Sequence, residues 1–170
     1  KKEGDSWEDT PSLVLPTTLK TPFVGEGQKI WYQGSLDGKS DTLLVSNSLD
    51  ELPEPVNLGN CKNVRNMYFH PDSLDPFSVL TDCGDSFKMV YLDNNSKGAR
   101  WHKSLVNQFP NSIIRLGWTE DGKRAFVVIS SSTNPGDFYL LDTDKKSINY
   151  IGSSNQSLDL DLLSKSELFK

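Results

Sequence analysis

The chain has 170 residues, of which 35% are apolar and 24% charged, a balance typical of a globular domain with its own core. Its net charge of −5 argues against a nucleic-acid-binding protein, which usually presents a basic face. No apolar stretch approaches the roughly 20 residues of a membrane-spanning helix, and the polar start KKEGDSWEDTPS lacks the apolar core of a signal peptide. A cytoplasmic location is slightly favoured over a secreted or periplasmic one, although a signal peptide could have been removed.

The predicted elements are almost all strands. Residues 1–27 are expected to form a partly disordered N-terminal arm with a short strand at 13–15, because prolines 16 and 22 disfavour a helix. No segment before the tail shows a sustained helical period. Residues 157–170 are expected to be a linker toward a C-terminal domain outside this chain. Apolar, β-branched runs bounded by turn residues predict strands at 30–33, 42–46, 64–69, 77–80, 87–92, 101–106, 113–118, 124–130, 137–141 and 147–151.

Two stretches of the chain resemble each other at an offset of 49 residues. A repeat of this length with four strands is typical of a β-propeller blade, whose apolar faces are buried only when sheets stack. The sequence therefore predicts an all-β fold in which residues 28–156 form β-propeller blades, about three four-stranded antiparallel sheets. Closed propellers typically have four to eight blades, so a fragment, self-association of copies and a β-sandwich all remain open. The matching pairs are Phe69 and Trp118, Asp72 and Asp121, Phe77 and Phe126, Val79 and Val128, Leu92 and Leu141, and Asp93 and Asp142.

Four residues carry local predictions. Asp93 and Asp142 each follow the third strand of a repeat, where a carboxylate can accept a backbone N–H and organise the hairpin; simple exposure is an equal alternative. Cys61 and Cys83 are expected to be free thiols, because small disulfide-stabilised domains are much richer in cysteine. Their pairing is not excluded by the sequence.

Catalytic and metal-binding patterns are missing from the sequence. There is no G-x-S-x-G, no phosphate-binding glycine loop and no calcium loop, since Ser104 stands where an EF-hand needs glutamate. The two histidines, His70 and His102, are expected at the surface, in a turn and in an edge strand. The sequence therefore predicts no catalytic, cofactor or metal site within this chain.

Residues 101–158 resemble the last part of the propeller domain in prolyl-oligopeptidase-type (S9) serine peptidases. The resemblance rests on the Trp118 and Asp121-Gly122 hairpin, the strand AFVVIS, the loop Thr133-Asn134-Pro135-Gly136, the run FYLLD and the return KKSINYIG. Gln156 departs from the bulky residue or proline that family members often have there. In this family an α/β-hydrolase domain follows the propeller.

The resemblance implies a non-catalytic propeller portion that gates peptide access to a hydrolase domain, with peptides as substrates of the whole protein. Arg100 and Trp101 are candidate peptide-binding residues, because arginine can hold a carboxylate in a bidentate manner; core packing is the favoured interpretation of Trp101, Trp118 and Trp31. The alternative is a free-standing propeller or β-sandwich that serves as an interaction scaffold. A glycan-cleaving propeller needs paired carboxylates, and the repeat-equivalent positions of Asp72 and Asp121 argue against it.

Overall fold

The structure is a computed structural model, and it describes residues 22–36, 38, 40–84, 86–155, 157, 159 and 162–165, with the backbone of 2–3, 6–7 and 18–19. It divides into two compact units, Lys1–Asn66 with Leu80–Val90, and Met67–Val79 with Tyr91–Lys170. The strand predicted at 13–15 and most of the predicted linker lie outside the described residues. Within the described part, no helix is long and apolar enough to cross a membrane.

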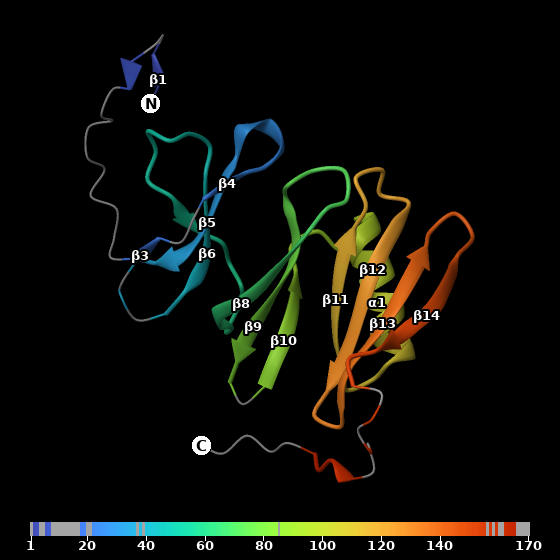
Figure 1. The fold of residues 1–170 in the computed structure, drawn as a ribbon. Helices are drawn as coiled ribbons and strands as arrows, with labels where there is room; N and C mark the ends of the chain where they lie inside the picture. The colour runs from blue at the N-terminus through green and yellow to red at the C-terminus, as the bar shows by residue number, and fades with distance from the viewer. Residues whose placement is uncertain are drawn as a thin grey trace. The chain divides into compact units, whose positions relative to one another are not determined.

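The first unit is built on a sheet with the strand order β3-β5-β6-β7, and β4 also pairs with β5 (Figure 1). The β5–β6 hairpin buries Ile30, Tyr32 and Leu44, because alternate residues of paired strands share a face. The strands predicted at 30–33 and 42–46 are confirmed. The elements are β1 (Lys2–Glu3), β2 (Ser6–Trp7), β3 (Thr18–Leu19), β4 (Phe23–Val24), the 3-10 turn η1 (Glu26–Gln28), β5 (Ile30–Ser35), β6 (Thr42–Ser46) and β7 (Glu54–Pro55).

A three-stranded sheet in the order β10-β9-β8 contributes residues to both units. Its strands are β8 (Lys62–Phe69), β9 (Pro76–Cys83) and β10 (Ser86–Tyr91). A disulfide joins Cys61 to Cys83, so the prediction of two free thiols is wrong. The reason is register: consecutive strands joined by a short turn run antiparallel, which brings the start of β8 beside the end of β9.

An ion pair lies close to this disulfide. The guanidinium of Arg65 donates two hydrogen bonds to the carboxylate of Asp82, at 2.9 and 2.8 Å, and Asn63 Nδ2 donates a third at 3.2 Å. These hydrogen bonds, that of Arg65 first, lower the pKa of Asp82. Arg65 is more than half exposed, so the pair adds little stability and chiefly fixes the surface of β8 and β9.

The second unit contains a four-stranded antiparallel sheet, in which β11 (Ile113–Trp118), β12 (Arg124–Ser131), β13 (Asn134–Asp142) and β14 (Ser147–Ser153) follow one another in space as in sequence. On β12 the residues Ala125, Val127 and Ile129 are buried, and they form a core cluster with Ile114 and Leu141. The predicted strands of this region are confirmed. This consecutive meander is the strand order of a propeller blade.

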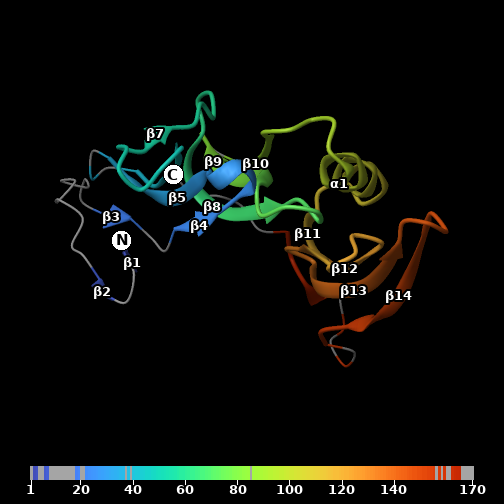
Figure 2. The same cartoon turned by 90° about the horizontal axis from the view of Figure 1, so that it is seen from above.

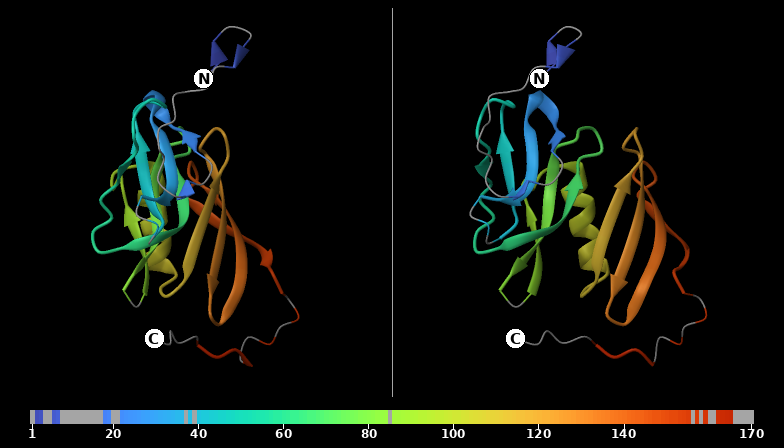
Figure 3. Two further views of the ribbon diagram at one scale, coloured as in Figure 1. Left: turned by 90° about the vertical axis from the view of Figure 1, so that its left-hand side faces the viewer. Right: turned by 60° about the vertical axis from the view of Figure 1, so that its left-hand side comes forward.

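The helix α1 (Lys97–Gln108) stands where a strand was predicted at 101–106, and that prediction is wrong. Ser96 caps its first turn by accepting the N–H of Ala99 at 3.1 Å. Ala99, His102 and Leu105 are buried at a helical spacing. A small residue and a histidine occupy two of these three positions, which hid the period. Leu105 packs into the core cluster, so α1 lies against one face of the β11–β14 sheet (Figures 2 and 3).

The 49-residue repeat is visible in three strands, not four. Phe69 ends β8 and Trp118 ends β11, and β9 and β10 correspond in order to β12 and β13. The same offset places the counterpart of β14 at residues 98–104, which lie inside α1. The expected series of four-stranded sheets is therefore wrong for the middle sheet. The described chain is mostly β with one long helix, and none of its described sheets closes on itself.

Two turn predictions have different outcomes. Asp93 Oδ1 accepts the N–H of Asn95 at 2.9 Å, and Asp142 Oδ1 accepts those of Asp144 and Lys145 at 3.2 and 3.0 Å, which confirms that both carboxylates accept backbone N–H groups. These N–H groups, that of Lys145 first, lower the pKa of Asp142. The hairpin prediction is confirmed for Asp142, between β13 and β14, and is wrong for Asp93, because α1 follows it. By contrast, β13 already begins at Asn134, so the loop expected at 133–136 ends earlier than predicted.

Candidate functional site

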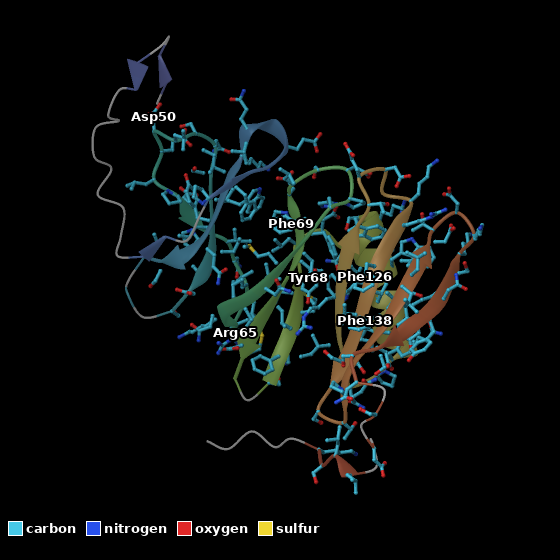
Figure 4. All side chains as sticks on the ribbon, viewed as in Figure 1. Asp50, Arg65, Tyr68, Phe69, Phe126 and Phe138 are labelled. Carbon is cyan, nitrogen blue, oxygen red and sulfur yellow. A yellow bond between two sulfur atoms is a disulfide. The ribbon has the colours of Figure 1, made fainter. Side chains whose placement is uncertain are left out.

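The main candidate site is a groove of about 500 Å³ in the second unit, which lies within the usual size of a ligand pocket. It is lined by two segments from repeat-equivalent places, the end of β8 with its following turn, and the end of β11 with its following turn. Figure 4 labels Tyr68 and Phe69 at the end of β8. The lining residues are 67–74 and 116–120.

Contacts beside the groove fix its two turns against each other. A Cβ added to Gly122 would lie 2.9 Å from Asp72 Oδ1 and 3.0 Å from Pro71 Cβ, so the two turns are in close contact. Gly122 also has φ +61°, which favours glycine. Lys97 Nζ donates a hydrogen bond of 2.6 Å to the carbonyl of Gly122, and this ties the start of α1 to the same turn.

The groove is acidic. Asp72 and Glu120 line it, and Asp93 Oδ2 lies 3.8 Å from Nε2 of the lining residue His70. Asp121, next to the groove, has a lowered pKa, chiefly because the Thr119 hydroxyl donates a 2.7 Å hydrogen bond to it. With mostly apolar neighbours such as Leu74, which is 61% exposed, the groove suits a ligand that is both cationic and apolar.

The structure does not place the predicted residues Arg100 and Trp101 in this groove. Both lie on α1, where Arg100 is exposed and Trp101 packs against the core cluster of the β11–β14 sheet. Trp118 packs against the same cluster and also lines the groove. Core packing is thus confirmed for Trp101 and Trp118. A role of Arg100 in peptide binding remains a prediction.

His102 lies in the interior, where the sequence had placed it on the surface. Its side chain is 1% exposed. Nε2 is 3.1 Å from the carbonyl of Ile114, which can only accept, so Nε2 carries the proton and Nδ1 accepts the hydroxyl of Tyr91 at 2.8 Å. Burial lowers the pKa of His102 and raises the pKa of Tyr91 to about 12. With both nitrogens occupied, His102 is a structural link between α1, β10 and β11.

The groove could not be predicted from the sequence, because its lining residues come from two segments about 50 positions apart. The one signal that points to them is the repeat itself, since its first matched pair, Phe69 and Trp118, lies on the two sides of the groove. Among the residues that the structure describes, no three His, Cys, Asp or Glu side chains gather as metal ligands would. The groove offers apolar contact, charge and backbone edges, which are the means of binding a chain segment.

Comparisons of this chain with protein-family models, with curated proteins and with solved structures found no match.

Proposed function

We propose that this chain is a non-catalytic β-propeller portion of a prolyl-oligopeptidase-type (S9) serine peptidase, where it gates peptide access to a hydrolase domain. The proposal joins the sequence resemblance over residues 101–158 to the meander order of β11–β14. A single blade is stable only when both of its faces are covered. What covers each face of the β11–β14 sheet therefore bears on whether the sheet belongs to a stack of blades.

One face of the β11–β14 sheet carries a partly exposed apolar patch. Strand pairing puts Phe126 opposite Leu140, and Val128 opposite Phe138, on the face that points away from the core cluster. Phe126 stacks on Phe138 with ring centroids 5.6 Å apart, yet 46% of Phe126 is exposed (Figure 4).

The observation that carries the proposal is the contrast between Phe126 and its repeat equivalent, Phe77. Phe77 is fully buried, and Gly98 of α1 lies directly against its ring. The helix α1, which follows the earlier repeat, therefore covers Phe77, whereas the equivalent Phe126 of the later repeat stays exposed. This pattern supports a further sheet or helix that packs on Phe126, as in a stack of blades.

The test uses the natural gene product that contains this chain. We expect a fluorophosphonate probe to label it at a serine, and we expect it to cleave a short proline-containing peptide but not the same sequence within a folded protein. Phe126→Asp should raise cleavage of the larger substrate relative to the short one, because it disrupts the stacking face. Leu52→Asp, a change at a similarly exposed apolar residue of the first unit, should not. A gene product without probe labelling would contradict the proposal.

The exposed face also favours the alternative of a free-standing scaffold that self-associates. In that case two copies would cover each other's Phe126 and Phe138, since a two-fold interface uses the same patch twice. Sedimentation of the natural gene product separates the two functions: a dimer or ring that Phe126→Asp dissociates supports the scaffold, and a monomer supports the peptidase portion.

A further inference from the structure

We infer that the open edge of β11 binds an extended peptide segment with a basic side chain, by adding a strand to the β11–β14 sheet within the groove. β11 is an edge strand, because only β12 pairs with it in the sheet order. Edge strands expose unpaired N–H and C=O groups, and a peptide can use these as a template. The inference concerns this chain alone and does not depend on a hydrolase domain.

The direction of the backbone groups on β11 follows from two hydrogen bonds. In an antiparallel pair, residues alternate between those that bond to the partner strand and those that point away. Thr119 N–H donates to the Arg124 carbonyl at 2.9 Å, so Thr119 faces β12. Trp118, Leu116 and Ile114 lie one, three and five positions earlier, so their backbone groups must point away from β12. The Ile114 carbonyl does so, since it accepts from His102. Leu116 and Trp118 therefore present their N–H and C=O groups to the open edge.

The first part of this edge is closed and the second part is open. His102 of α1 occupies the carbonyl of Ile114. Leu116 and Trp118 line the groove. Among the described residues no backbone hydrogen bond from outside the sheet reaches Leu116 or Trp118. The edge therefore offers two donors and two acceptors at a spacing of two residues, which is the spacing of an added strand.

Charge selects the peptide. The groove lining carries the carboxylates of Asp72 and Glu120, with Asp93 and Asp121 close by. The neighbouring cation, Lys97, donates to the carbonyl of Gly122 and lies 6.0 Å from the centre of the Trp118 ring, so four carboxylates stand near one ammonium. A lysine or arginine on the added strand would thus meet opposite charge, while an acidic peptide would be repelled. Apolar side chains next to it would contact the exposed Leu74.

The test is binding of a labelled peptide, acetyl-Thr-Val-Lys-Val-Thr-amide, measured by fluorescence anisotropy with the 170-residue chain. We expect saturable binding that weakens about tenfold or more when the two valine nitrogens are methylated, since methylation removes donors and blocks strand pairing. Replacing the peptide lysine with glutamate should weaken it similarly. Asp72→Asn with Glu120→Gln should weaken binding and flatten its salt dependence. Asp144→Asn, in a turn outside this groove, is the matched control.

Amide hydrogen exchange locates the peptide. Binding should slow exchange at Leu116 and Trp118 about tenfold or more, whereas Arg115 and Gly117, which bond to β12, should change little. The inference is overturned if the peptide does not bind up to about 1 mM, if the methylated peptide binds as tightly, or if the protected amides lie elsewhere. Loss of this binding would leave the proposed peptidase function untouched, because that function is read from probe labelling of the natural gene product.

Discussion

Replacing Gly98 with alanine should destabilise the protein, although alanine normally stabilises a helix. Gly98 is in the first turn of α1, and a Cβ at this position would lie 2.6 and 2.7 Å from two ring carbons of Phe77. Favourable carbon contacts lie near 3.5–4.0 Å, so about 1 Å of overlap must be relieved. The ring is fully buried and packs against Tyr68 and His70, at centroid distances of 6.3 and 5.8 Å.

The magnitude follows from two opposing terms. Overpacking a buried site costs about 1–3 kcal/mol, and the gain in helix propensity is at most about 1 kcal/mol. We expect Gly98→Ala to lower the free energy of unfolding by about 1–2 kcal/mol, or Tm by several degrees. Urea unfolding followed by circular dichroism, with the disulfide intact, measures the change. Ser104→Ala, at an exposed position of the same helix, should change stability by less than about 0.5 kcal/mol.

A double-mutant cycle makes the cause specific. Phe77→Leu is expected to be destabilising alone, but it removes ring atoms that the new methyl group would meet. Gly98→Ala should therefore cost less in the Phe77→Leu background than in the natural chain. Equal or higher stability of Gly98→Ala, or strict additivity in the cycle, would refute the close packing of α1 on Phe77.

Two further predictions concern His102 and the disulfide. Burial lowers the pKa of His102 in the folded protein, whereas in the unfolded chain the pKa is near its ordinary value of 6.5, so the unfolded state binds more protons as the pH falls through 6.5. The free energy of unfolding should be highest above pH 6.5 and fall below it by up to about 1.4 kcal/mol per pH unit. His102→Gln should remove this slope, whereas His70→Gln should retain it. An unchanged slope in His102→Gln would contradict the hydrogen-bonded burial of His102. The Cys61–Cys83 bond closes a loop with a sequence separation of 22 residues. The double variant Cys61→Ser with Cys83→Ser should therefore lower the free energy of unfolding by about 3 kcal/mol. An equally stable double variant, or two free thiols in a thiol assay of the natural chain, would contradict the pairing.

Strand positions were largely predictable because their signal is local. The alternation of apolar and polar residues and the turn residues at their ends identified β6 and β11 with the bounds that the structure has. The helix was missed because its buried face uses Ala99 and His102 in place of large apolar residues. A helical period is detected from large apolar side chains at every third or fourth position. A helix that is buried through small residues and a hydrogen-bonded histidine does not show that period.

The disulfide and the groove depend on which residues meet in space. Cys61 and Cys83 become neighbours only once β8 and β9 are paired, and one sequence does not give that register. Trp118 was recognised as a core residue, but its second position, at the edge of a groove, depends on the turn after β8. The repeat paired Phe69 with Trp118, but it did not show that the two residues line one groove or that carboxylates lie beside them.

The central claim is that another sheet or helix packs on the open face of β11–β14 in the natural gene product. Hydroxyl-radical labelling with mass spectrometry tests it directly, with the exposed Tyr150 as the internal reference. The account predicts strong labelling of Phe126 in the isolated 170-residue chain and marked protection in the natural gene product as a monomer. Equal labelling of Phe126 in both would contradict it.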